Sequence, residues 1–212
     1  MNVISFSLWG NIERYHLGVY ENIKLAKEIF PNFNIVIYYD DSVSTDRIKN
    51  LENEDVTLIN ATHIPCNSMM WRFLASDTDG IFLSRDLDSR LGYREKYAVE
   101  EWLNSDKDFH IMRDHPEHAV KILGGMWGSR NGIMKKIHDM IFSFPEVDLS
   151  DLYKVQVDQS FLAKVVYPIV KDKSMVHDEF FERKPFPLKS PKRTRTYFVG
   201  QSYDENNQPI YR

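Results

Sequence analysis

Asp86 and Asp88, near the middle of the chain, have the residue type and the spacing of a pair that holds a divalent cation. They follow an apolar run, Gly80–Leu83, that predicts a buried strand, so both carboxylates stand where the chain must bend and can reach one ion. Mg²⁺ and Mn²⁺ prefer carboxylate and phosphate oxygens. An ion held there would neutralise a leaving nucleoside diphosphate. The structural alternative is that these carboxylates only cap a turn or pair with Arg85 or Arg90.

The elements that must position these aspartates alternate between strand and helix signals. Strands are predicted at Val3–Leu8, Phe33–Tyr39, Val56–Ile59 and Gly80–Leu83, with helices that end before Pro31, run from Ser44 to Leu51 and begin after Asn67. Strands that alternate with helices favour an α/β fold with a mostly parallel sheet covered on both faces. Ligands of such sheets bind beyond the carboxyl ends of the strands. Asp40 and the Asp86–Asp88 pair both fall at such ends.

The second half of the chain is less regular. The pattern predicts a helix over Glu95–Leu103, a strand over Phe109–Met112, a loop rich in His, Gly and Trp from Arg113 to Gly128, and helices from about Asn131 to Ile141 and from about Leu152 to Val166. We expect a single domain in three parts, over residues 1–90, residues 91–183 and a basic tail over 184–212. The chain could also be one domain of a larger polypeptide.

Composition limits the classes of function. Hydrophobic residues make up 42% and aromatic residues 13% of the chain, which is enough for a packed core, and the net charge of -4 gives no support for nucleic-acid binding. No apolar stretch approaches the roughly 20 residues needed to cross a bilayer, and the first residues lack the features of a signal peptide. The only cysteine, Cys66, fits a reducing compartment. We therefore expect a cytoplasmic protein without a membrane span.

Several segments resemble GT-A glycosyltransferases, in particular the N-terminal GT-A domain of a chlorella-virus glycosyltransferase. The resemblance makes residues 1–90 the nucleotide-binding half and residues 91–183 the donor-sugar and acceptor half. The similar segments are Ser7 to Gly10, Asn67 to Phe73, Arg85 to Arg90, Arg113 to Pro116 and Gly124 to Gly128. Together they cover most of the chain, and the resemblance is weakest after about Lys184. It implies a GT-A fold and the transfer of a hexose or deoxyhexose from a UDP-sugar to a glycan acceptor. It also implies Mn²⁺ or Mg²⁺ on the diphosphate and a retaining mechanism.

The resemblance also implies a set of ligand contacts. The nucleotide would be held by Ser7, Leu8, Trp9, Arg14, Tyr15 and Asp40, and the phosphates and sugar by Arg72, Asp86, Gly124, Gly125, Trp127, Gln159 and Lys184. The metal ligands would be Asp86, Asp88 and His177, and the catalytic residues Asp158 and Asp114. Trp127 could instead fill the core, and His177 could be an ordinary surface histidine.

Two other classes of function compete with sugar transfer. A HAD-like phosphohydrolase would use Asp86 as its nucleophile and Asp88 as its acid and base. Its motif, however, normally has Thr or Val where this chain has Arg90, and it normally follows the first strand of the sheet. A non-catalytic binding module would use the basic segment Lys184–Arg195 to dock a partner. Such a module would bind a nucleotide-sugar without consuming it.

Overall fold

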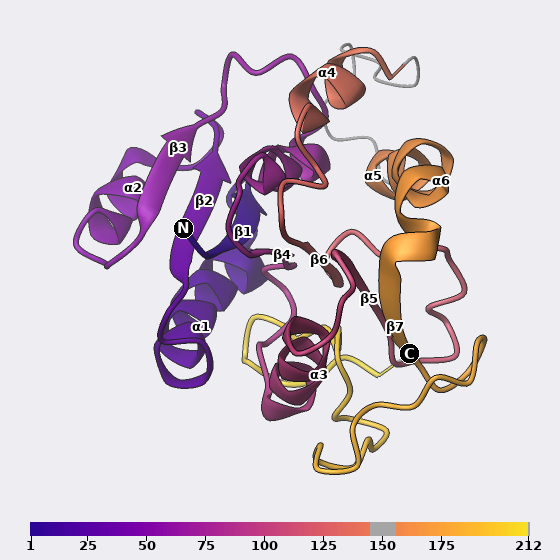
Figure 1. Cartoon of the computed structure of the whole chain (residues 1–212). Helices are drawn as coiled ribbons and strands as arrows, with labels where there is room; N and C mark the ends of the chain where they lie inside the picture. Colours follow the sequence, from indigo (N-terminus) through magenta and orange to yellow (C-terminus); the bar gives the residue numbers. More distant parts are fainter. Residues whose placement is uncertain (145–155, 212) are drawn as a thin grey trace.

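The computed structural model describes residues 1–144 and 156–211, and in this part of the chain seven strands form one sheet in the order β3-β2-β1-β4-β6-β5-β7 (Figure 1). The strands are β1 Val3–Leu8, β2 Asn34–Tyr39, β3 Thr57–Asn60, β4 Phe82–Ser84, β5 Phe109–Arg113, β6 Trp127–Ser129 and β7 Ser174–Asp178. Among these described strands, only β6 runs antiparallel to its neighbours. The carboxyl ends of the other six strands therefore meet at one edge of the sheet.

Helices cover both faces of this sheet (Figure 1). One face carries α1 Glu13–Ile29, α2 Thr45–Leu51 and α3 Tyr93–Leu103. The other face carries the 3₁₀ helix η1 Ser68–Ser76, α4 Ile137–Phe142, α5 Val157–Phe161, the π-helical turn η2 Leu162–Val166 and α6 Tyr167–Val170. The short η3 Lys171–Lys173 follows α6 directly. Alternate residues of β1 serve the two sides: Ile4, Phe6 and Leu8 pack under α1, while Val3 packs on the opposite face. No helix in the described ranges is long and apolar enough to cross a bilayer.

The predicted α/β class and mostly parallel sheet are confirmed, and the departures are local. β6 lies inside the predicted glycine-rich loop, where three residues are too few to show a strand period. The helix predicted from about Asn131 is regular only in α4, because Asn131, Gly132 and Lys136 adopt positive φ angles. Residues 152–155 of the last predicted helix lie outside the described residues, and the described part is helical from Val157 onward.

The C-terminal segment from Lys184 to Tyr211, coloured yellow in Figure 1, folds back onto the sheet edge instead of extending away. Tyr203 donates its backbone N–H to the carbonyl of Asp88 at 2.7 Å, and Ser202 forms an isolated bridge with Ser89. The guanidinium of Arg90 lies 4.9 Å from the centre of the Tyr203 ring. The predicted tail is therefore part of the structure around the two aspartates.

Candidate functional site

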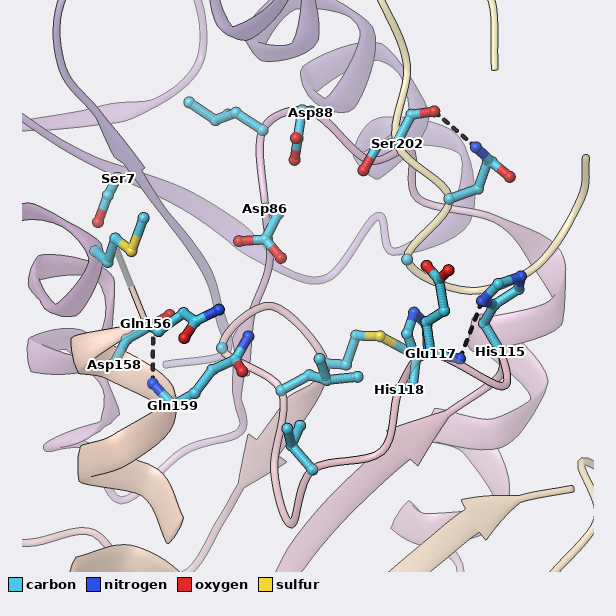
Figure 2. Close-up of a pocket in the computed structure, with 18 of the residues that line it drawn as sticks. Ser7, Asp86, Asp88, His115, Glu117, His118, Gln156, Asp158, Gln159 and Ser202 are labelled. Atoms are coloured by element: carbon cyan, nitrogen blue, oxygen red, sulfur yellow. Dashed lines mark hydrogen bonds between the residues drawn. The ribbon is translucent and has the colours of Figure 1, made fainter. Parts of the chain in front are cut away.

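A cavity of about 530 Å³ opens at the carboxyl ends of β1 and β4 (Figure 2). Among the residues predicted to bind ligands, it is lined by Ser7, Trp9, Tyr15, Arg72, Asp86, Asp88, Gly124, Asp158 and Gln159. Figure 2 shows the side chains of Asp86 and Asp88 directed into this space, with Asp158 and Gln159 on the wall below them. The structure thus brings together residues as far apart in sequence as Ser7 and Gln159.

Helix α1 holds the loop that carries the two aspartates. A Cβ atom on Gly18 would overlap the backbone carbonyl of Leu87, so a glycine is needed for α1 to pack this closely. One turn further along α1, the buried Asn22 donates to the carbonyl of Ser89 at 2.8 Å and accepts from the N–H of Leu91 at 3.0 Å. These contacts fix the backbone directly after Asp88, so the packing of α1 determines where the Asp88 carboxylate lies.

Arg72, on η1, is the cation at the centre of the site. Its two terminal nitrogens lie 2.9 Å from Asp86 and 3.0 Å from Asp158, and its backbone N–H donates to the Ser7 hydroxyl at 3.0 Å. Burial raises the pKa of Asp158, Arg72 partly opposes this rise, and Asp86 adds to it. Because one Asp158 oxygen accepts from Arg72 and the other from the N–H of Gln159, its carboxylate holds other groups in place.

Gly124 and Gly125 are required by the close approach of this cluster. A Cβ atom on Gly124 would overlap the Asp158 carboxylate and the Arg72 guanidinium, and one on Gly125 would overlap the Asp86 carboxylate. The hydroxyl of Ser84 donates to the Gly124 carbonyl at 2.6 Å and ties the glycine loop to the end of β4. Of the pair, Gly124 lines the cavity, while Gly125 sets the space available to Asp86.

The charge of the cavity is predominantly negative. Its described lining includes the carboxylates of Asp86, Asp88, Glu117 and Asp158, and in that same lining Arg72 is the only lysine or arginine. An anionic diphosphate entering alone would meet excess negative charge, whereas a divalent cation would be attracted. No three His, Cys, Asp or Glu side chains among the described residues form a metal cage, so an ion held by Asp86 and Asp88 would need further oxygens from its ligand.

The loop after β1 and the first turn of α1 supply an aromatic wall. Trp9 and Tyr15 both line the cavity, and their ring centres are 5.9 Å apart. Arg14 lies beside the cavity, where it donates to the Tyr15 hydroxyl at 3.1 Å and stacks over the Tyr15 ring. Two of the predicted contacts lie elsewhere: Leu8 is fully buried in the core, and Asp40 accepts from the N–H and hydroxyl of Ser42 as part of the turn after β2.

Asp114 occupies a structural position rather than the predicted catalytic one. It is fully buried, receives two hydrogen bonds from Arg94 at 2.7 and 2.9 Å, and accepts from the backbone N–H of Val199 at 2.9 Å. It is absent from the described lining of the cavity. Burial raises the pKa of its carboxyl, and Arg94 and the Val199 N–H oppose this rise. Asp114 therefore anchors the C-terminal segment to α3.

Residues just after Asp114 reach the cavity in its place. His115, Glu117 and His118 line the wall that faces Asp158 and Gln159 across the cavity in Figure 2. The sequence signal was the loop itself, which is rich in His, Gly and Trp. Which of its polar residues faces the cavity depends on the C-terminal segment, which contributes Phe198, Gly200, Gln201, Ser202 and Ile210 to the lining.

Trp127 and Lys184, both predicted to contact the donor, lie away from the described lining. Trp127 is fully buried on β6 and stacks on Phe109 with ring centres 5.2 Å apart, so the core interpretation of this tryptophan holds. Lys184 is exposed, pairs with Glu182 at 2.9 Å and exchanges backbone hydrogen bonds with Asp178. Neither position leaves the side chain free to bind a phosphate or sugar in the cavity.

His177, the predicted third metal ligand, is not brought to the two aspartates. It lies on β7, three strand spacings of about 4.8 Å from β4, on the face covered by α3. Its Nδ1 lies 2.8 Å from Nε2 of His110, and its Nε2 lies 3.0 Å from Glu101. Since both ring nitrogens are engaged, the geometry favours a structural role.

This buried histidine pair predicts a pH-dependent stability. Burial lowers the pKa of His110 well below 6.5 and also lowers that of His177, so both rings are neutral when folded. Unfolded rings take up protons below pH 6.5, so stability present above that pH is lost as the pH falls. When the pH falls from about 7.5 to about 5.5, we expect the stability of His177→Gln to fall less than that of the parent. The difference is at most about 1 kcal/mol, the limit for a histidine that stays neutral in the folded state. Urea unfolding at the two pH values measures this, and equal losses would contradict it.

The same variant tests the metal assignment. If His177 is structural, His177→Gln binds UDP and Mn²⁺ as tightly as the parent does. A clear loss of metal affinity in a folded variant would return His177 to the ligand set.

No protein-family model matches this chain, and no curated protein matches it. Solved structures do resemble it. S. aureus TarS 1-349 has a TM-score of 0.50 and 12% identity, over 88% of this chain and 59% of that one. Glucosyl-3-phosphoglycerate synthase from Mycobacterium tuberculosis, in complex with Mn²⁺, UDP-glucose and phosphoglyceric acid, has a TM-score of 0.50 and 11% identity, over 84% and 68%.

A third similar structure is 4-diphosphocytidyl-2C-methyl-D-erythritol synthase from Anaerococcus prevotii, with a TM-score of 0.50 and 10% identity over 89% of this chain and 92% of that one. At such identities the likenesses establish the fold alone. The chain spans 59% of the TarS fragment, so any activity of the longer protein is not carried over with the fold. The sheet order, the helices on both faces and these likenesses together show that the chain adopts the GT-A fold.

Proposed function

We propose that this protein is a metal-dependent glycosyltransferase that moves a hexose or deoxyhexose from a UDP-sugar to a glycan acceptor. The observation that carries the proposal is the placement of Asp86 and Asp88 together in an acidic cavity at the carboxyl edge of a GT-A sheet. Ligands of open α/β sheets bind at this edge. The negative lining requires a cation before a diphosphate can enter.

Asp86 and Asp88 are the residues that would hold Mn²⁺ or Mg²⁺, since both line the cavity and offer the hard oxygens that these ions prefer. The bound ion would stabilise the negative charge of the departing nucleoside diphosphate. Arg72 keeps Asp86 in place through its 2.9 Å ion pair, and Asp158 in turn holds Arg72. Asp158 is therefore proposed as a positioning residue.

The two ends of the cavity suit the two ends of a nucleotide-sugar. Trp9 and Tyr15 offer ring faces for the uracil base, while Gly124 and Gln159 offer backbone and amide groups to sugar hydroxyls. The crystal structure of the mycobacterial synthase holds Mn²⁺ and UDP-glucose, and this supports a UDP-sugar as the donor. The choice of UDP over other nucleotides rests on this likeness and on the resemblance of the sequence motifs.

The proposal includes retention of the anomeric configuration. In the transfer, an acceptor hydroxyl oxygen bonds to the anomeric carbon, the bond from that carbon to the diphosphate oxygen breaks, and the diphosphate keeps the electron pair. The carboxylates of Asp114 and Asp158 are committed to Arg94 and Arg72, so neither serves as a base. The hydroxyl proton then passes to the leaving diphosphate. An inverted product would indicate Glu117, the other cavity carboxylate outside the metal pair, as the base.

Other reactions remain distinguishable by experiment. The Anaerococcus neighbour is a synthase of a diphosphocytidyl compound, so the fold alone does not separate sugar transfer from nucleotidyl transfer. A triphosphate substrate would bring more negative charge, however, and Arg72 is the only lysine or arginine in the described lining. A HAD-like phosphohydrolase would need Asp86 as a free nucleophile, yet one of its oxygens pairs with Arg72 at 2.9 Å.

Calorimetric titration of UDP with and without Mn²⁺ tests the proposal. We expect UDP to bind with Mn²⁺ and to bind at least ~10-fold more weakly in its absence, because the acidic lining repels the bare diphosphate. UMP, which lacks the second phosphate, serves as the matched control and should show little dependence on the ion. Equal UDP affinity with and without Mn²⁺ would overturn the metal site, and preferential binding of CTP would favour nucleotidyl transfer.

A further inference from the structure

A second cavity of about 680 Å³ adjoins the first. The two share Val120, Gln156 and Gln159 in their linings, so these three residues form the boundary between the two spaces. The remaining lining of the second cavity is Arg113, Ala119, Lys121, Ser160, Ala163, Phe181 and Glu182. It lies on the side of the first cavity where Asp158 and Gln159 stand, which is the proposed sugar end.

One wall of the second cavity is a single helix face. Gln159, Ser160 and Ala163 lie three and four residues apart, so they project from one side of α5 and η2, and Gln156 lines the cavity from the position just before α5. The opposite side packs into the core through residues such as Phe161, which is fully buried. The helix face that lines the cavity therefore carries polar or small side chains, which matches a ligand with many hydroxyl groups.

The second cavity carries few charged groups in its described lining: Arg113, Lys121 and Glu182. The guanidinium of Arg113 is occupied by Asp178, by the carboxylate of Glu182 and by the carbonyls of Val120 and Lys121. It therefore builds the wall and has no remaining preference for an anion. The Lys121 ammonium lies over the Tyr167 ring, 5.2 Å from its centre. The charge left in the described lining is therefore the exposed Lys121 ammonium, and these residues hold no cluster of cations that would select a multiply charged anion.

Phe181 gives the cavity an aromatic surface. Its side chain is 46% exposed, although large apolar side chains are usually buried, and it lines the cavity beside Ala119 and Val120. A pyranose ring has an apolar C–H face and a rim of hydroxyls. An aromatic face combined with two glutamine amides and a serine hydroxyl matches both features.

We propose that the second cavity is the acceptor site and that it takes a neutral saccharide, with one sugar ring on Phe181 and hydroxyl groups on Gln156, Gln159 and Ser160. This inference rests on the proposed function, because it places the acceptor next to the transferred sugar. Gln159, which lines both cavities, stands where the acceptor hydroxyl meets the anomeric carbon. The new glycosidic bond forms at this junction, and UDP departs through the first cavity.

Blocking the second cavity separates the two sites. Ala163→Trp fills the cavity from the helix, and Ile169→Trp adds the same ring at an exposed position of α6 outside the cavity lining. Saturation-transfer NMR with UDP and the diamagnetic Mg²⁺ then measures binding of maltose, cellobiose and lactose, while calorimetry measures UDP affinity. We expect the parent and Ile169→Trp to bind a disaccharide and Ala163→Trp to lose at least ~10-fold in its affinity, with UDP affinity unchanged in all three.

The outcomes are distinct for the two proposals. If the parent protein binds UDP but none of these disaccharides, or if Ala163→Trp binds them as the parent does, the acceptor assignment is wrong. If the parent does not bind UDP, the proposed function fails first, and the calorimetry shows this independently of the NMR. Phe181→Ala removes only an exposed ring, so it tests the stacking contact even if the tryptophan variant does not fold.

Discussion

Asp88→Ala is expected to raise the Kd of UDP in the presence of Mn²⁺ by at least ~100-fold, which corresponds to about 3 kcal/mol. The variant leaves Asp86 as the one carboxylate for the ion, and Asp86 already shares an oxygen with Arg72. Among the described residues no group of three His, Cys, Asp or Glu side chains could hold an ion, so removing one of the two proposed carboxylate ligands removes most of the affinity. Calorimetry of UDP with Mn²⁺ measures the change.

Asp41→Ala is the matched control. Asp41 is also an aspartate at a strand end on this edge of the sheet, but it is exposed and lies outside the described lining of the cavity. The control should bind UDP and Mn²⁺ like the parent. Asp88 is only partly buried, so we expect thermal unfolding of Asp88→Ala to resemble that of the parent. A folded Asp88→Ala with unchanged metal-dependent UDP affinity would remove this residue from the metal site.

The fold was accessible from the sequence wherever an element was long enough to show a period. The strand Val3–Leu8 appears as predicted, and the helix predicted to end before Pro31 is present as Glu13–Ile29. The strand Trp127–Ser129 could not be recognised, because three residues define no period and glycine, here Gly128, is rare in strands. Gly128 is there because a Cβ atom would lie 2.9 Å from the Phe82 carbonyl on the neighbouring strand.

Some residues of the candidate site could be predicted from local sequence and others could not. Residues at strand ends, such as Ser7, Asp86 and Asp88, follow from the general rule for ligand sites in α/β sheets, and the structure gathers them. Local sequence could not separate Asp114 from its neighbour Glu117, since both are acids in one polar loop. Burial and the Arg94 ion pair decide between them, and Arg94 lies on a different helix.

The sequence could not predict, for a further reason, that residues of the C-terminal segment line the cavity. This segment has no periodic apolar pattern, and its position depends on single contacts such as the one from Val199 to Asp114. Gly200 shows how specific these contacts are: it has a φ of +87°, which favours glycine, and a Cβ atom there would lie 2.6 Å from the sulfur of Met126. Long-range packing of this kind leaves little trace in the residues on either side.

Gly125→Ala is expected to destabilise the protein by about 1–3 kcal/mol and to raise the Kd of UDP with Mn²⁺ by at least ~10-fold. The added Cβ atom would lie 2.9 Å from the backbone nitrogen of Asp86 and would overlap its carboxylate. A side chain could rotate away, but the backbone nitrogen is fixed by the end of β4. The loop or Asp86 must therefore shift, and either movement separates the proposed metal ligands. Urea unfolding and calorimetry measure the two effects.

Gly92→Ala provides the comparison for this variant. A Cβ atom on Gly92 would lie 3.4 Å from the Tyr197 hydroxyl, an ordinary contact, and its φ of -150° suits alanine. It should change stability little and leave UDP binding intact. The comparison also separates two effects within Gly125→Ala. If stability falls but the folded fraction binds UDP and Mn²⁺ normally, then Asp86 can move without loss and is not the ligand that fixes the ion. If binding falls together with stability, the narrow space beside Gly125 is what places the Asp86 carboxylate opposite that of Asp88.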